Sequence, residues 1–219
     1  LALYPFVYTI AGSFNDGIDY EYGGIWLFPR KFTLANYITV FTDARLYKAF
    51  FNTVIATVAG VAGGLVFTSC VAYAMSHPKL KFHKVFWVIN MITMFFGGGL
   101  IPYFMLIKGI GLYNSFLVYI IPSLYSVYNM IVLTNFFRGI DNSMRESAML
   151  DGANEFRIWW SLYMPVSMPA LATVGLWLTV GHWNSYMPTL IYTKKDESMW
   201  LLQFYLMKII KDTNLPDAD

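Results

Sequence analysis

Charged residues and cysteines are scarce in this sequence. Only 13% of its 219 residues are Asp, Glu, Lys or Arg, whereas about a quarter of the residues in an ordinary soluble domain are charged. This shortage excludes a typical soluble domain. The single cysteine, Cys70, excludes a disulfide framework. Its position in an apolar run favours a small, buried hydrophobic side chain.

Basic and catalytic groups are equally sparse. The net charge is +2, and no basic stripe alternates with the aromatic residues, which excludes a nucleic-acid partner. The three histidines are scattered, and no Gly-x-x-x-x-Gly-Lys-Ser/Thr phosphate loop is present. Asp16, Asp19 and Glu21 form an acidic group, for which a solvated loop is a far more frequent role than metal binding. We therefore expect no metal site and no catalytic residues.

Apolar residues, in contrast, are abundant: 57% of the chain is hydrophobic and 19% is aromatic. They form uncharged runs at residues 49–76, 85–107, 109–137 and 158–193. Each run exceeds the roughly 18 residues that indicate a membrane span, and none has a charged face that would meet water. The sequence therefore predicts an all-α membrane protein with several crossings.

Breaker residues divide these runs into elements. After a first-helix remnant and a polar connector on one membrane face, we expect a helix over residues 49–76. The next helix should end at Phe96, before three consecutive glycines. The remaining predictions are an interfacial helix over 101–110, a span over 116–137 interrupted by Pro122, and a span over 167–192. We expect the chain to be cut at both ends, because residues 1–13 open in mid-helix and residues 200–210 are too short to span.

The loops indicate which way the chain is inserted. Residues 77–84 contain three lysines and no acid, so this loop is expected to be cytoplasmic, and Pro78 suits the first turn of the next helix. Two further crossings place residues 138–161 on the same side. Lys81 and Arg145 should therefore be cytoplasmic, while Asp19 and Lys195 lie outside.

The polar segment between the last two long runs has signals for two short helices. Ser143 and Glu146 have the spacing of a capping box, so a helix should begin at Ser143. Gly152 should end it, and Asn154 is a suitable N-cap for a second helix that stops before Pro165. Two short amphipathic helices joined at a glycine would form a compact projection that docks into another protein.

This segment resembles the signature of ABC-importer permeases, which is Glu-Ala-Ala, three residues, Gly, nine residues, then Ile-x-Leu-Pro. It stands here as Glu146-Ser147-Ala148, Gly152 and Leu162-Tyr163-Met164-Pro165, with Asp151-Gly152-Ala153 in the form common among sugar permeases. The spacing matches throughout. Ser147, Leu162 and Met164 are mild departures from the pattern.

The resemblance extends over nearly the whole chain. Residues 95–102 and 181–185 are similar to the branch that handles complex oligosaccharides. The resemblance implies a helical bundle of the type I ABC-importer permease kind in the bacterial plasma membrane, with about five of the six core helices present as spans. It also implies one permease domain over residues 1–219, within which residues 138–164 form the coupling-helix loop.

The same resemblance implies partners. They are a second homologous permease, a cytoplasmic ATPase dimer that holds ATP and Mg, an extracytoplasmic sugar-binding protein and membrane lipid; this chain itself would bind no cofactor. The residues that would couple to the ATPase are Glu146, Ser147, Ala148, Asp151, Gly152, Ala153 and Pro165.

A possible substrate pathway lies in the last predicted span. Trp183, Asn184 and Tyr186 are expected to face a central cavity, because an amide in hydrocarbon without a partner costs several kcal/mol. His182 is more simply a hydrogen-bonded packing residue. A secondary transporter is the first alternative function, but it would place carboxylates near the midplane, and the predicted spans contain none. A membrane-embedded enzyme is the second, and it would need a catalytic set that is absent.

Overall fold

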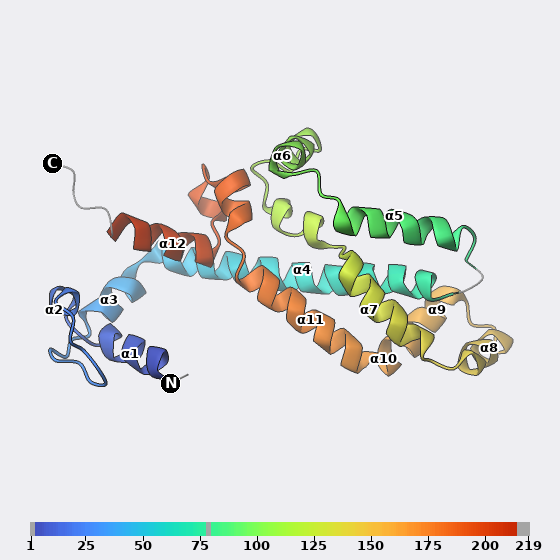
Figure 1. The fold of residues 1–219 in the computed structure, drawn as a ribbon, viewed down its shortest axis with the longest axis horizontal. Coiled ribbons are helices and arrows are strands. Elements are labelled where there is room, and N and C mark those ends of the chain that lie inside the picture. The colour runs from blue at the N-terminus through green and yellow to red at the C-terminus, as the bar shows by residue number, and fades with distance from the viewer. Residues whose placement is uncertain (1–2, 78–79, 214–219) are drawn as a thin grey trace. The chain divides into compact units, whose positions relative to one another are not determined.

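The computed structural model describes residues 3–77 and 80–213, and within these ranges most of the chain is helical (Figure 1). The only extended pairing among them is an isolated antiparallel bridge between Asn15 and Phe32. The all-α class expected from the sequence is confirmed. The chain divides into two compact units, residues 1–50 and 51–219. The expected helix start at Pro78 and the outermost residues of both predicted cut ends lie outside the described residues.

The first unit contains α1 (Tyr4–Ser13), α2 (Gly17–Glu21) and α3 (Ala35–Thr42). Its acidic residues serve the local structure. The Asp16 carboxylate caps α2 by accepting from the backbone amides of Ile18 and Asp19. The Asp19 carboxylate accepts from the Asn15 amide, which lowers its pKa, and pairs with Arg30 at 3.1 Å. Among the described residues, no group of His, Cys, Asp and Glu is placed to hold a metal ion.

The second unit contains the other helices of the chain, of very different lengths. They are α4 (Ala44–Ser76, which begins in the first unit), α5 (His83–Phe95), α6 (Leu100–Gly109), α7 (Val127–Arg138), α8 (Asn142–Leu150), α9 (Glu155–Ile158), α10 (Met164–Val166), α11 (Met168–Trp183) and α12 (Leu202–Thr213). The 3-10 turns η1 (Phe116–Tyr119) and η2 (Ile121–Ser123) precede α7, and the π-helical turns η3 (Trp159–Tyr163) and η4 (Thr189–Thr193) follow α9 and α11.

Among the described residues, α4 alone is long and apolar enough to cross a membrane as one helix. Three more crossings are possible if each bent pair of helices forms one broken span. The pairs are α5 with α6, bent by 116°; residues 116–123 with α7, bent by 44°; and residues 155–166 with α11, bent by 84°.

The breaks follow the predicted residues in most places. The glycines end α5 as expected, and Gly99 adopts φ +81°, which a side chain would disfavour. The predicted span over 167–192 is too long, because α11 ends at Trp183 and Asn184 caps it. Pro188, which has no amide hydrogen, follows four residues later. A helix-ending amide and a proline therefore interrupt an apolar run that hydropathy alone reads as continuous.

An aromatic core joins four helical segments at one end of the second unit. It contains buried side chains from α4, α7, α9 with η3, and α11. The Tyr163 ring contacts Tyr73 with centroids 4.8 Å apart and Phe137 at 5.6 Å, both edge to face. Such pairs contribute about 0.5–1.5 kcal/mol beyond their buried area. This core is the base from which residues 138–164 project.

Neutral polar groups organise the opposite end of the unit. The buried hydroxyl of Tyr119 lies 3.0 Å from the Thr189 hydroxyl and 2.5 Å from that of Thr193, and it donates to the Met199 carbonyl at 2.8 Å. The Asn52 amide donates to the Ser198 carbonyl at 2.8 Å. Asn52 stands 24 residues before Ser76 in α4, a rise of about 36 Å. The segment around Lys195 and the 138–164 loop therefore lie at opposite ends, as the predicted topology requires.

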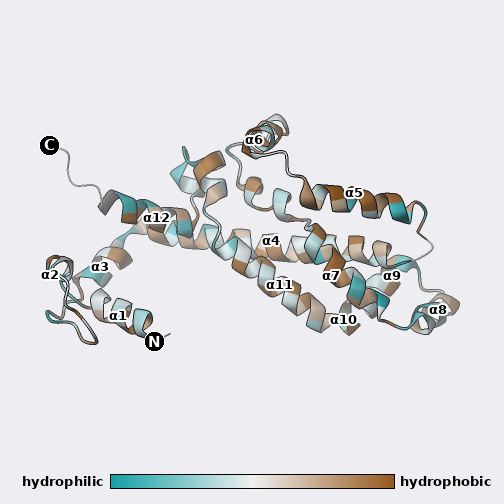
Figure 2. Ribbon diagram, in the orientation of Figure 1, coloured by the Kyte–Doolittle hydropathy of each residue, from teal (hydrophilic) through white to brown (hydrophobic). Residues whose placement is uncertain are grey.

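The outer surface of the second unit is apolar. No residue of α5 is buried in the chain, although the helix consists largely of hydrophobic residues (Figure 2). Its side chains Val88, Ile92 and Phe95 are more than half exposed. A continuous apolar surface of this kind belongs in lipid or against another membrane protein.

Candidate functional site

The first short helix of the 138–164 loop begins one residue earlier than the capping box predicts. Asp141 is the N-cap of α8 and accepts a hydrogen bond from the Ser143 amide at 2.9 Å, which lowers the pKa of the Asp141 carboxyl. The prediction that Ser143 and Glu146 cap each other is therefore wrong. Aspartate caps as well as serine does. Asp141 has the extended backbone of an N-cap residue and stands directly before the first helical residue. Among the described residues, the Glu146 carboxylate has no hydrogen bond or ion pair.

The end of α8 explains the spacing of the signature. The Ala153 amide donates to the Ala148 carbonyl and the Gly152 amide to the Met149 carbonyl, both at 3.0 Å. These two bonds form a Schellman motif, which requires a left-handed residue directly after the cap. Gly152 supplies it with φ +79°. The small side chains of Ala148 and Ala153 pack against the aromatic core, so the signature alanine, the glycine and the next alanine act as one turn. Ser147 and Asp151 are exposed beside it.

The second short helix begins as predicted and ends later. The Asn154 side chain accepts from the Arg157 amide at 2.8 Å, so its N-cap role is confirmed. The chain then continues through the π-helical turn η3 and α10, where Pro165 lies within the first two positions. The expectation that Pro165 stops the helix is wrong, because the widened turn before it accommodates the missing amide hydrogen. The sharp bend falls at Ser167.

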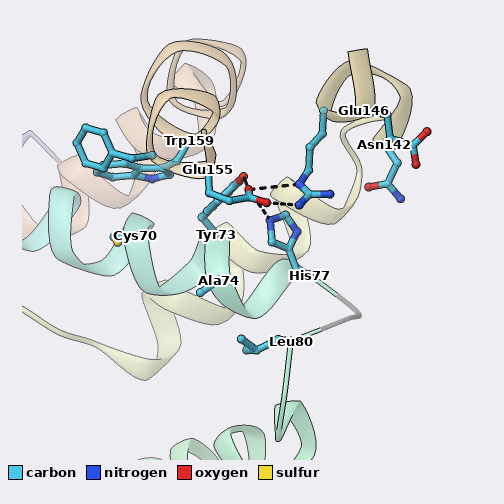
Figure 3. A pocket seen from close by; sticks show the side chains of 11 residues that line it. Cys70, Tyr73, Ala74, His77, Leu80, Asn142, Glu146, Glu155 and Trp159 are labelled. Atoms are coloured by element: carbon cyan, nitrogen blue, oxygen red, sulfur yellow. Dashed lines mark hydrogen bonds and ion pairs between the residues drawn. The ribbon is translucent and has the colours of Figure 1, made fainter. Parts of the chain in front are cut away.

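A carboxylate holds the two short helices and α4 together. Glu155, at the start of α9, accepts hydrogen bonds from two nitrogens of Arg145 of α8, from Nε at 3.4 Å and from Nη2. The Tyr73 hydroxyl of α4 donates to the same carboxylate at 2.5 Å. His77 Nε2, just after α4, lies 3.7 Å from Glu155 Oε2. Figure 3 shows Tyr73 and His77 pointing toward Glu155 from below, while Glu146 points away from it.

A second contact fixes the beginning of the loop. Arg138, the last residue of α7, donates to the Met75 carbonyl at 3.3 Å, and its guanidinium lies over the Trp87 ring at 5.5 Å. It also lies 3.3 Å from His83 Nε2. Glu155 and Arg138 therefore both contact the end of α4 or the segment that follows it. The loops at 77–84 and 138–164 thus lie at the same end of the unit.

The residues that meet at Glu155 line a cavity of about 560 Å³. Its lining combines apolar side chains such as Cys70 and Trp159 with the charged groups Arg145, Glu146 and Glu155. Burial, followed by the positive charge of Arg145, lowers the pKa of His77, which also lines it. His77 is therefore neutral near pH 7.

The outer face of the loop is apolar as well as charged. Met149 and Phe156 are 47% and 67% exposed, and Leu150 is 89% exposed. No residue of α8 is buried. The loop thus presents exposed hydrophobic side chains next to the free carboxylate of Glu146, which is the pattern of a docking surface.

Several residues of this site were absent from the sequence-based prediction. Tyr73, His77, Arg145 and Glu155 meet only in three dimensions. A weak signal existed, since Tyr73 and His77 are four apart at the end of an uncharged run, and Arg145 and Glu155 have opposite charges in one loop. Asp141 carried a direct signal as a capping residue.

The predicted pathway residues lie at the end of α11. Trp183 is half-buried, and Tyr186 is 39% exposed. The Asn184 side-chain amide donates to the Val180 carbonyl at 2.9 Å. Its own helix therefore already provides one hydrogen-bond partner for this amide. A small cavity of about 280 Å³ lies nearby, lined by His182 and Ser185. His182 Nε2 is 3.3 Å from the Ser123 hydroxyl, in agreement with a hydrogen-bonded packing role.

Known proteins share this sequence and architecture. Residues 85–216 match the family described as binding-protein-dependent transport system inner membrane component. The chain is 34% identical, over 96% of its length and 73% of the relative, to the polygalacturonan/rhamnogalacturonan transport system permease protein YtcP of Bacillus subtilis (strain 168). It is 32% identical to Protein LplC of the same organism, over 100% of this chain and 75% of the relative.

A solved structure has the same fold. It is a bacterial ABC transporter involved in the import of the acidic polysaccharide alginate. The superposition has a TM-score of 0.92 at 34% sequence identity and covers 99% of this chain and 77% of the other. The similarity thus includes the 138–164 loop and the bent helix pairs.

Proposed function

Since the chain belongs to the family of binding-protein-dependent transport system inner membrane components, we propose that it forms, with a second homologous permease, the pathway of an importer for an acidic oligosaccharide. As a multi-pass membrane subunit, it does no chemistry of its own in this proposal. ATP and Mg²⁺ are handled by a cytoplasmic ATPase dimer, and an extracytoplasmic binding protein delivers the substrate.

The acidic substrate class has two supports. The two 34%-identical relatives, one by sequence and one by structure, are named for polygalacturonan/rhamnogalacturonan transport and for import of alginate. The helices α4, α5, α6, α7 and α11 contain no Asp or Glu. A uronate-containing saccharide would therefore meet no fixed charge of its own sign in these helices, which matters because unlike charges attract and like charges repel most strongly where water is scarce.

The uptake of two labelled trisaccharides tests this class. We expect a host strain that encodes the chain to lose uptake of trigalacturonate when the gene is deleted and to keep uptake of maltotriose. Loss of maltotriose uptake alone would replace the acidic class by a neutral one. Unchanged uptake of both would contradict import of either.

The coupling part of the proposal assigns the ATPase contact to residues 138–164. The observation that carries it is the Schellman turn at Gly152, which holds the exposed side chains of Met149 and Leu150 in one fixed direction. Glu146 lies on the same helix without an internal partner among the described residues. Its carboxylate is thus available for a basic residue of the ATPase.

Glu146→Lys tests this assignment without disturbing the fold, because Asp141 and not Glu146 caps α8. We expect the tagged permease to retain less ATPase during purification and to lose import. Glu197→Lys is the matched control, an exposed carboxylate in the turn η5 (Glu197–Met199) at the opposite end of the unit. It should retain the ATPase at the wild-type level. Normal ATPase retention and import by Glu146→Lys would show that the loop is only a capped connector.

A further inference from the structure

The 138–164 loop has an unequal attachment to the rest of the chain. The second short helix is anchored by Ile158, Trp159 and Tyr163, which are buried in the aromatic core. The first, α8, has no buried residue. The half-buried Ala148 and the Arg145 side chain, which reaches Glu155, connect α8 to the other helices that the structure describes.

Glu155 in turn connects α8 to the long span. Its carboxylate receives donors from two other segments, the Arg145 guanidinium of α8 and the Tyr73 hydroxyl of α4. Tyr73 is held in place by ring contacts with Tyr163 and His77, at 4.8 and 4.5 Å. One carboxylate therefore joins the two short helices of the loop to α4, whose Tyr73 lies 82 residues before Glu155 (Figure 3).

We propose that Glu155 is a positioning residue that makes α8, α9 and the end of α4 move as one body. The proposal rests on the docking function above and names the span that receives the motion. When the ATPase displaces the docked loop, the links from Glu155 to Arg145 and Tyr73 pass the displacement to α4.

The strength of the ion pair between Glu155 and Arg145 depends on how far water reaches it. The Glu155 side chain is 50% exposed and Arg145 24% exposed in the single chain, where water weakens an ion pair. Docking of a partner on the loop excludes water, and the same charges then attract more strongly. The link therefore tightens when the ATPase engages.

The long helix is suited to carry the motion across the membrane. α4 runs unbroken from Ala44 to Ser76. At its other end, Asn52 and Thr53 bond to the backbone of residues 198–202. A displacement at Tyr73 thus reaches the segment that follows α11 through one rigid element.

Two conservative variants test the link in the purified transport complex, reconstituted in liposomes. Tyr73→Phe removes one donor and Glu155→Gln removes the charge, and both leave the shape of the side chain almost unchanged. We expect import per ATP hydrolysed to fall by about fivefold, the lower bound of a typical coupling free energy, while the ATPase stays bound. Import is measured with labelled trigalacturonate. The matched control is Tyr47→Phe, whose hydroxyl bonds to the Phe41 carbonyl.

A charge exchange separates positioning from general damage. Arg145→Glu alone should uncouple as Glu155→Gln does. Arg145→Glu combined with Glu155→Arg restores an ion pair in the same place and should recover part of the import per ATP. A double variant no better than the singles would contradict a specific link.

A second readout does not depend on the substrate. Cys70, the only cysteine of the chain, is exposed in the cavity lined by Glu155 and Arg145, so the prediction of a buried side chain is wrong. With the link intact, the cavity moves as a body, so the maleimide labelling rate of Cys70 should be similar without ATP and with ATP and vanadate. In Tyr73→Phe and Glu155→Gln the rate should rise by about fivefold with ATP and vanadate, because the loop then moves away from α4.

The outcomes distinguish this inference from the proposed function. If Glu146→Lys loses the ATPase while Tyr73→Phe and Glu155→Gln import normally and label Cys70 at wild-type rates, docking stands and the positioning role is overturned. Reduced import with unchanged Cys70 labelling also overturns it. If Glu146→Lys is normal, the docking assignment is the one that fails.

Discussion

The two ends of the second unit use different kinds of polar chemistry. At the loop end, charged groups meet at Glu155 and remain partly open to water. At the other end, the Tyr119 hydroxyl bonds to two threonines and a carbonyl, and all of these side chains are buried. A neutral, satisfied network is rigid and needs no partner. An exposed ionic one is weak alone and becomes stronger when a partner covers it.

This difference in polar chemistry agrees with the function proposed for each end. The loop end must respond to a protein that binds and releases, so a contact whose strength depends on solvent suits it. The Tyr119 end connects η1 to the segment after α11 through buried hydroxyls, which do not depend on a partner. Changes at the loop should therefore affect transport more than stability, and changes at Tyr119 the reverse.

Among the variants that compare the two ends, Gly152→Val should have the largest effect on transport. Gly152 has φ +79°, and a Cβ at this position would meet no atom within 4 Å, so the substitution acts through the backbone alone. The left-handed conformation costs a side chain about 1–2 kcal/mol, and we expect import to fall by about tenfold or more. Uptake assays measure it, with thermal stability nearly unchanged. Gly152→Asn is the control, since asparagine tolerates this conformation. Equal loss in both variants would point to a side-chain effect instead.

Tyr119→Phe should have the largest effect on stability. Removal of the hydroxyl leaves the buried Thr189 and Thr193 hydroxyls without this partner, at a cost of about 1–3 kcal/mol. We expect a clearly lower melting temperature of the detergent-purified complex, with import per ATP retained. Tyr113→Phe, in the same part of the unit, should leave the melting temperature unchanged. A functional loss without destabilisation would reverse the comparison of the two ends.

Gly60→Ala tests the helix crossing between the two ends. A Cβ on Gly60 would lie 2.3 Å from the His182 ring, which forces α4 and α11 apart or displaces the ring. Overpacking of this kind costs about 1–3 kcal/mol, measured as a lower melting temperature. Gly181→Ala, where a Cβ meets nothing within 4 Å, is the control. Adding His182→Ala to Gly60→Ala should recover stability, and failure to recover it would exclude the ring as the cause.

The smallest effect concerns pH at the loop end. Burial and Arg145 lower the pKa of His77 in the folded chain, so the unfolded chain binds its proton at a higher pH. Stability then falls as pH drops below about 6.5, the unfolded value. His77→Gln should reduce the difference in melting temperature between about pH 7.5 and about pH 5.5. A larger difference in this variant would mean that protonated His77 stabilises the loop through Glu155.

Much of the architecture could be predicted from the sequence. The low charge and the uncharged runs determine an all-α membrane protein, and the spacing of Glu146, Gly152 and Pro165 identifies the permease family that residues 85–216 match. The glycines after Phe96 and the N-cap at Asn154 act within a few residues. Their effects on the backbone are local, so a linear pattern is sufficient to predict them.

Only the tertiary structure decided how the loop is held. Asp141 replaced Ser143 as the cap because the backbone leaves the extended conformation two residues earlier, and the turn η3 carried the helix past Pro165. The convergence of Tyr73 and Arg145 on Glu155 has no pattern in the sequence. Helix periodicity determines which residues share a face, but the partner of that face depends on how separate helices pack, and packing joins residues that lie far apart in the chain.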